Sequence, residues 1–304
     1  MKKTKAKRIS IFLILIVLVI SFSAIIYASA TIITNPTTIT FTDGNLYETM
    51  KKQLKSKKIA FNENDNEQTI EISLDDVSNI TELNLQGVND AKITNLTGLQ
   101  NFSNLTSLNL SGNAITNAES IGVLSKIKNL NLSDNPANES ILSTVSKLTS
   151  LKELNLSNTQ LNGDQLSNLK NLTSLEKIVI SKNNISSVES ISSLSGITSM
   201  DLSINKSFTD FKQLTTFRKL TELNVSGTGI TTFSGSNGTT THDGIELLVN
   251  LEKLYAQDNL NIISSGLNSI YATYNNGNGT VPYLGKIKVL NLSSIGASGK
   301  RPTI

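Results

Sequence analysis

The chain of 304 residues contains no cysteine. This absence excludes disulfide bonds, thiolate metal sites, thiol nucleophiles and a lipid-modified cysteine. A protein without disulfides must be stabilised by its core. The roughly 270 residues that follow the N-terminal segment are enough to form one.

Histidine is nearly absent, because His242 is the only one. It lies beside Asp243 in a polar segment, where an exposed loop histidine is the ordinary interpretation. No nucleophile, base and orienting group occur in a recognisable arrangement. The oxygen-rich run 62–67 lacks the central glycine and the bidentate glutamate of a calcium loop. We therefore predict a protein that is not an enzyme and has no catalytic residues, cofactor or metal.

A surplus of basic residues is also lacking. The chain has 27 Lys and Arg against 24 Asp and Glu, but five of the basic residues lie before residue 9, which leaves 22 against 24. The pattern gives no reason to expect a nucleic acid partner.

Only one long apolar run is present, the uncharged segment from Ile9 to Ala28. It follows the basic N-terminus and precedes the small residues Ala28-Ser29-Ala30, so residues 1–30 are predicted to be a cleaved signal peptide. The alternative is an N-terminal membrane anchor, because a run of about 20 apolar residues can span a bilayer. The protein would then contact the membrane only through residues 9–28. Both interpretations predict an extracellular protein, either secreted or anchored at the outer face of the membrane.

The pattern Leu-x-x-Leu-x-Leu, followed by a polar turn, occurs nine times. The copies begin at Ile80, Leu105, Ile127, Leu151, Leu175, Ile197, Leu220, Leu251 and Ile287. All steps except the last two are 22 to 25 residues long, which is the period of leucine-rich repeats. Residues 80–304 are therefore predicted to form an α/β repeat solenoid, a leucine-rich repeat horseshoe with a parallel concave sheet. The Ser- and Asn-rich returns favour short helices, 3₁₀ turns or coil on the convex side.

Asparagine recurs at the ninth place of the repeat, where its amide can bond the open backbone groups of the turn. We predict a structural ladder formed by Asn113, Asn135, Asn183, Asn205 and Asn259. Thr159 and Thr228 replace it in two repeats.

A different pattern precedes the repeats. Asp43 can cap a helix that places Leu46, Met50 and Leu54 on one face, and Ser73 can open a second short helix. Residues 41–79 are therefore predicted to form a small helical N-terminal cap over the apolar end of the solenoid. Residues 31–40 are expected to be a linker.

The run Phe41-Thr42-Asp43-Gly44-Asn45-Leu46, the later Ser73-Leu74-Asp75-Asp76-Val77, and repeats with Asn at the ninth and Ile at the eleventh place resemble bacterial internalin-like leucine-rich repeat proteins. The resemblance covers most of residues 41–230. It implies a surface or secreted binding module whose partners usually contact the concave sheet. Unlike many such proteins, this sequence shows no immunoglobulin-like module after Ile287, so we expect the last strand to lack a cap.

The outward strand positions of the first six repeats are small and polar, and strong interfaces usually need Trp, Tyr or Arg anchors. The C-terminal third holds two insertions, 231–245 and 263–286, and four of the six tyrosines. We therefore predict that a protein, or alternatively a glycan, binds the concave face or the C-terminal loops. The residues assigned to binding are Tyr255, Tyr271, Tyr274, Asp201, Lys177 and Lys253. The alternative is that these tyrosines fill the core of a degenerate repeat.

Two functions remain open. The first is an exported, non-enzymatic protein-binding or adhesion module, expected to be a monomer. The second is a structural component of the cell surface or matrix that self-associates through the ends of the solenoid.

Overall fold

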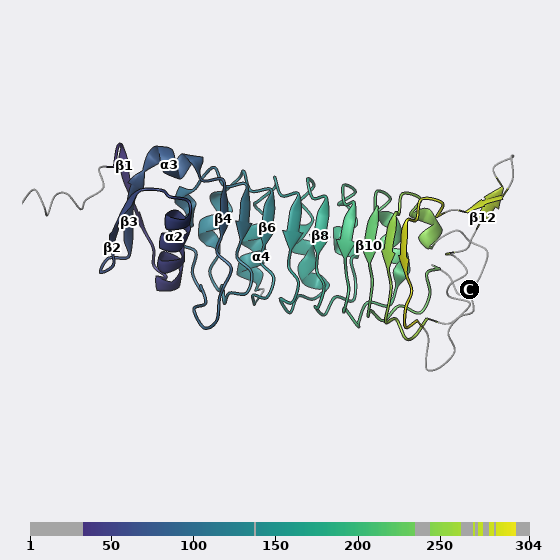
Figure 1. Cartoon of the computed structure of the whole chain (residues 1–304). Coiled ribbons are helices and arrows are strands. Elements are labelled where there is room, and N and C mark those ends of the chain that lie inside the picture. Colours follow the sequence, from purple (N-terminus) through teal and green to yellow (C-terminus); the bar gives the residue numbers. More distant parts are fainter. Residues whose placement is uncertain are drawn as a thin grey trace, which may run out of the picture.

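The computed structural model describes residues 33–136, 138–234, 244–262, 270, 273–275, 280–282 and 284–295. They form an elongated solenoid with a cap at its N-terminal end, and the strands follow one another along its length (Figure 1). Within these ranges, no helix combines the length and the apolar character needed to cross a membrane.

Nine short strands form one parallel sheet, and each pairs in register with the strand of the next repeat. They are β4 (Glu82–Asn84), β5 (Ser107–Asn109), β6 (Asn129–Asn131), β7 (Glu153–Asn155), β8 (Lys177–Val179), β9 (Ser199–Asp201), β10 (Glu222–Asn224), β11 (Lys253–Tyr255) and β14 (Val289–Asn291). Each strand covers the third to fifth places of its repeat. The predicted leucine-rich repeat solenoid is confirmed.

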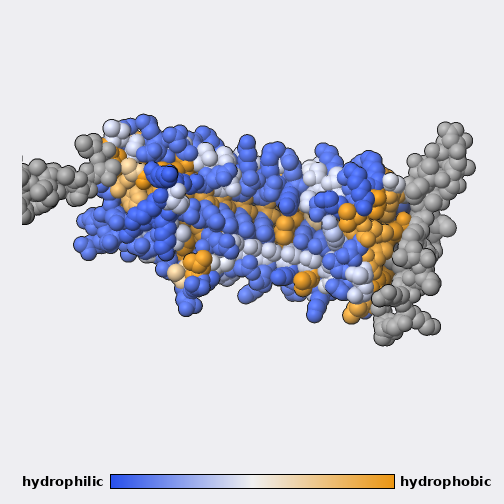
Figure 2. Space-filling view, in the orientation of Figure 1, coloured by the Kyte–Doolittle hydropathy of each residue, from blue (hydrophilic) through white to orange (hydrophobic). Residues whose placement is uncertain are grey.

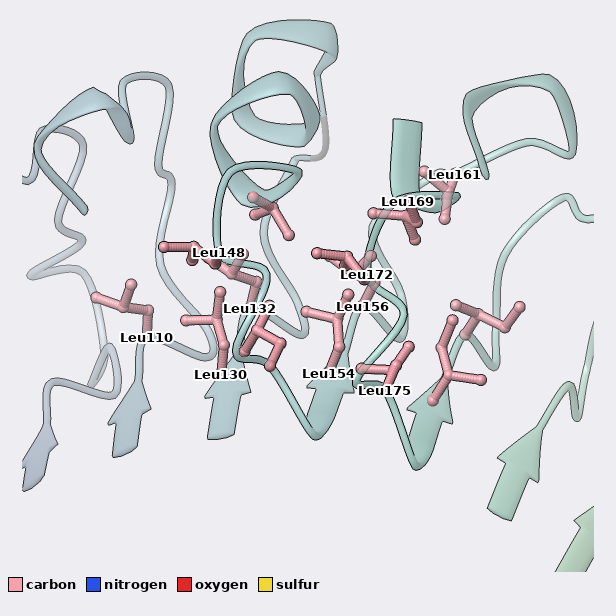
Figure 3. Close-up of a cluster of buried hydrophobic side chains, with 14 of the residues drawn as sticks. Leu110, Leu130, Leu132, Leu148, Leu154, Leu156, Leu161, Leu169, Leu172 and Leu175 are labelled. Atoms are coloured by element: carbon pink, nitrogen blue, oxygen red, sulfur yellow. The ribbon is translucent and has the colours of Figure 1, made fainter. Parts of the chain in front are cut away.

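The opposite side of the repeats consists mainly of short 3₁₀ helices. They are η1 (Leu99–Asn101), η2 (Glu119–Val123), η3 (Asp164–Leu169), η4 (Glu189–Ile191), η5 (Phe211–Thr216) and η6 (Ile245–Leu247), together with the α-helix α4 (Glu139–Val145). Leucines of both sides point into the space between strands and turns (Figure 3). Leu154 and Leu156 are at most 1% exposed. Burying each such side chain stabilises the fold by roughly 1.5–3 kcal/mol.

The ninth-place asparagines connect neighbouring repeats. Asn205 is fully buried, and its Nδ2 donates to the carbonyl oxygens of Leu202 at 2.8 Å and Ile180 at 2.9 Å. Its Oδ1 accepts from the Ile185 amide at 2.9 Å. Donation to the carbonyl three residues back and to one in the preceding repeat recurs at Asn113, Asn135, Asn183 and Asn259. Thr159 and Thr228 make only the first of these two bonds.

From the second repeat on, the eighth place of the repeat lies in the left-handed region of the backbone. Gly112, Asp134, Asn158, Lys182, Ile204, Gly227, Asp258 and Ser294 all have φ between 53° and 68°. Glycine, asparagine and aspartate tolerate this conformation, whereas a β-branched side chain is strained in it. Ile204, with φ 60° and 47% exposure, is therefore a strained residue on the surface.

The N-terminal cap contains a sheet as well as helices. The helices α2 (Gly44–Ser56) and α3 (Leu74–Asn79) accompany β1 (Pro36–Thr40), β2 (Phe61–Asn64) and β3 (Thr69–Ser73), which pair antiparallel in the order β1-β3-β2. The expectation of a linker was thus wrong for residues 36–40. Ile39 is buried and pairs with Ile70, a partner too distant in sequence for a local pattern to identify.

Asp43 connects the cap to the first repeat through hydrogen bonds. Its Oδ1 accepts from the Leu46 amide of α2 at 2.9 Å, and its Oδ2 accepts from the Thr94 amide and hydroxyl and from the Asn95 amide at 2.7–3.1 Å. Burial raises the pKa of this carboxyl, but the hydrogen bonds from Thr94, Leu46 and Asn95 outweigh that effect, so the pKa lies below its ordinary value.

Candidate binding surface on the concave sheet

The third- and fifth-place side chains point outward from the sheet and form its concave surface. Seven of the nine fifth-place side chains also cap their own turn. Asn84, Asn109, Asn131, Asn155, Asp201, Asn224 and Asn291 each accept, through Oδ1, the amide two residues later. The hydrogen bond to the turn is therefore sufficient reason for these residues, and no ligand has to be invoked.

Val179 and Tyr255 are the two exceptions in this fifth-place row. Neither side chain can accept an amide in this way as Asn does, and both are partly exposed. Because the turn does not require them, they are the candidate binding positions of the fifth-place row.

Charged side chains occupy several third places. Lys253 of β11 forms an ion pair with Glu222 of β10 at 3.2 Å. The hydrogen bond to Glu222 raises the pKa of Lys253. Glu153 of β7 and Lys177 of β8 stand in the same register, since their Cα atoms are paired, but no ion pair joins them. Both are exposed.

A shallow hollow of about 280 Å³ lies over β5 to β8. Its lining consists of Ser107, Leu108, Asn109, Asn129, Leu130, Asn131, Glu153, Leu154, Asn155, Lys177 and Val179. The hollow combines polar side chains, one of them acidic and one basic, with the apolar Val179 and three leucines of the strands. An arrangement of this kind can hold charged and hydrogen-bonding groups of a ligand.

The structure places four of the six residues assigned to binding on this sheet. Lys177, Asp201, Lys253 and Tyr255 lie on β8, β9 and β11, and the strand β10 separates Asp201 from Tyr255. Asp201 also accepts the Ser203 amide at 2.9 Å, so it has a structural role. Tyr271 lies outside the described residues. Tyr274 belongs to β12 (Thr273–Asn275), which pairs with β13 (Thr280–Pro282).

Sequence reasoning missed Glu153 and Val179 as candidate site residues. A signal existed for both, because Glu153 is one of five charged residues at the nine third places, and Val179 interrupts the asparagines of the fifth place. His242 and Asp243 lie outside the described residues. Within the described part of the chain, no three His, Asp or Glu side chains are placed to share a metal.

The side chains of the oxygen-rich run 62–67 form hydrogen bonds within the cap. Asp65 accepts from Lys51 Nζ and from the Tyr47 hydroxyl, both at 2.7 Å. Burial and the hydrogen bond to Asp65 raise the pKa of Tyr47 to about 12. Asn64 Oδ1 accepts the amides of Asn66 and Glu67. These oxygens stabilise the β2–β3 hairpin and its contact with α2.

Comparison with known proteins shows the same type of repeat. A family model for the leucine-rich repeat domain of the endo-beta-N-acetylglucosaminidase EndoS matches residues 87–183. The crystal structure of internalin C2 from Listeria monocytogenes is 25% identical, with a TM-score of 0.60, over 78% of this chain and 94% of that protein. An internalin, InlF, from the same organism is 18% identical over 86% and 92% of the two chains, but its TM-score of 0.38 is too low to support an argument. No curated protein sequence is significantly similar to this one.

Proposed function

The chain is an internalin-like leucine-rich repeat protein, a fold that serves as a protein-interaction module, and on this premise we propose that it is exported and binds a partner protein through its concave sheet without catalysing a reaction. The observation that carries the proposal is the concave surface itself. Its backbone requirements account for most fifth-place residues but leave Tyr255 and Val179 unexplained.

Tyr255 is the predicted anchor of the interface. It is partly exposed on β11, between Asn224 of β10 and Asn291 of β14. A tyrosine combines a large apolar ring with a hydroxyl and loses little conformational entropy on binding. The asparagine side chains around it supply adaptable hydrogen bonds. Tyr271 and Tyr274 remain assigned to the same interface through the second insertion.

Site-specific photo-crosslinking tests the surface. We would replace Tyr255 on the concave side, or Val123 on the convex side, by a photoreactive aromatic residue and irradiate the cells that naturally produce the protein. Val123 is a matched control because it is 68% exposed. Covalent protein adducts are expected from position 255 and not from position 123. Adducts only from position 123 would contradict the proposal.

The location of the protein is tested by fractionating these cells and measuring the N-terminus of the product by mass spectrometry. A product released from the cells and beginning at Thr31 would establish secretion. A membrane-bound product that keeps Met1 would establish an outward-facing anchored protein. A product found in the cytoplasm would refute export.

A structural role through self-association is the second candidate, and the exposure of the last repeat favours it. Leu290 is 41% exposed, whereas the fourth-place residue of every other repeat is at most 3% exposed. Apolar residues gather at this end of the described surface (Figure 2). Open apolar ends can pair with one another. Light scattering distinguishes the candidates, since the mass of a monomer at every concentration would exclude assembly.

A further inference from the structure

Two equivalent Glu and Lys pairs on the concave sheet behave differently. Each pair occupies third places on adjacent strands, with the glutamate one repeat before the lysine. Glu222 and Lys253 form an ion pair at 3.2 Å. In the described part of the chain, the side chains of Glu153 and Lys177 have neither a hydrogen bond nor an ion pair. The register of the strands therefore permits an ion pair at both places, but only Glu222 and Lys253 form one.

The free charges of Glu153 and Lys177 lie in the hollow over β5 to β8. The neighbouring Asn131 and Asn155 use their Oδ1 atoms for their own turns. Their Nδ2 groups have no partner among the described residues, so they remain available as donors. The hollow thus offers one acidic acceptor, one basic donor and two amide donors on the same surface.

We infer that this hollow binds a segment of a partner protein that presents an acidic side chain to Lys177 and a basic side chain to Glu153. The inference rests on the proposed function and specifies the chemistry of the partner. A neutral or acidic glycan would leave Glu153 without a counter-charge, whereas a polypeptide readily supplies both signs. Charge complementarity of this kind selects the partner and fixes its orientation.

Spacing indicates how the partner segment is folded. Neighbouring strands lie about 4.8 Å apart. Side chains at positions i and i+4 of a helix have Cβ atoms about 5–6 Å apart. A helix carrying Glu and Lys four residues apart can therefore reach both charges of the hollow.

The probes are blocked alanine-rich helical peptides in which Glu and Lys are four residues apart in either order, and a third peptide with Gln at both places. Binding to the purified full chain is measured by fluorescence anisotropy. One of the two charged peptides is expected to bind about tenfold more tightly than the Gln peptide. The double substitution Glu153→Lys and Lys177→Glu is expected to reverse which order is preferred.

The control is the double substitution Glu252→Ala and Lys288→Ala, which removes an exposed ion pair outside the hollow and should leave the preference unchanged. Circular dichroism verifies that each variant is folded. Equal binding of charged and Gln peptides would overturn the inference, and so would binding of a uronic acid oligosaccharide in place of the peptides. If either of these results were obtained while photo-crosslinking still gave adducts from position 255, only the assignment of this hollow would be wrong. Absence of concave adducts would instead refute the proposed function.

Discussion

Replacing Asn205 by alanine should destabilise the solenoid more than any single surface substitution. The amide satisfies three buried backbone groups, namely the Ile180 and Leu202 carbonyls and the Ile185 amide. A buried polar group left without a partner costs about 1–3 kcal/mol. The Ile180 carbonyl keeps its bond from Asn183 Nδ2 at 3.0 Å, so two groups lose their partner, a loss of about 2 kcal/mol at the lower end of that range. This is a large share of the roughly 5–15 kcal/mol that stabilises a typical domain.

Urea unfolding followed by far-ultraviolet circular dichroism measures this loss. Asn205→Thr should be intermediate, because Thr159 shows that a hydroxyl at this place still donates to the carbonyl three residues back. Asn129→Ala is the control, since Asn129 is exposed on the same sheet and its change should stay within about 0.5 kcal/mol.

Hydrogen exchange gives a local readout. The Ile185 amide should exchange faster in Asn205→Ala than in Asn129→Ala, because it loses its acceptor only in the first variant. The reasoning would be refuted if Asn205→Ala were as stable as the control. The asparagine ladder would then follow from the repeat without contributing to the stability of the solenoid.

Three further predictions concern the backbone and the cap. Asp43→Asn should destabilise the protein at neutral pH. Because the folded-state pKa of Asp43 is lowered, its stabilisation is present above the unfolded value and is lost as pH falls through the folded pKa, so the stability difference between the two proteins should shrink as the pH falls below the folded pKa. Gly87→Ala should destabilise by about 1–3 kcal/mol, since its Cβ would lie 2.2 Å from the Gly112 carbonyl oxygen, whereas Gly44→Ala, whose nearest contact is 3.8 Å away, should be neutral or stabilising in the same urea assay. Ile204→Asn should raise the thermal midpoint by relieving about 1 kcal/mol of left-handed strain, and a lower midpoint would show that contacts of the isoleucine outweigh that strain.

Features that recur at the same place from repeat to repeat could be predicted from the sequence. The strand positions, the leucines that face the interior and the places of the ladder asparagines recur at the same offsets, so nine copies reinforce one another. The internalin-like fold followed from the same pattern together with the cap motif. The cap helices were recognisable from Asp43 and Ser73, which accept the Leu46 and Asp75 amides.

Features that depend on contacts between distant segments could not be predicted. The sheet of the cap joins β1 to β3 across a helix and a hairpin, and no local period marks such a pairing. The second use of the fifth-place asparagines, as caps of their own turns, also became visible only with the backbone in place.

The sequence by itself determined the repeat, its parallel sheet and the polar character of the concave face, because these follow from apolar spacing along the chain. Only the tertiary structure decided that Glu222 and Lys253 pair while Glu153 and Lys177 stay free beside a hollow. The physical reason is that periodicity fixes where each Cα atom lies. The pairing of two long charged side chains depends on their rotamers and on their neighbours in adjacent repeats.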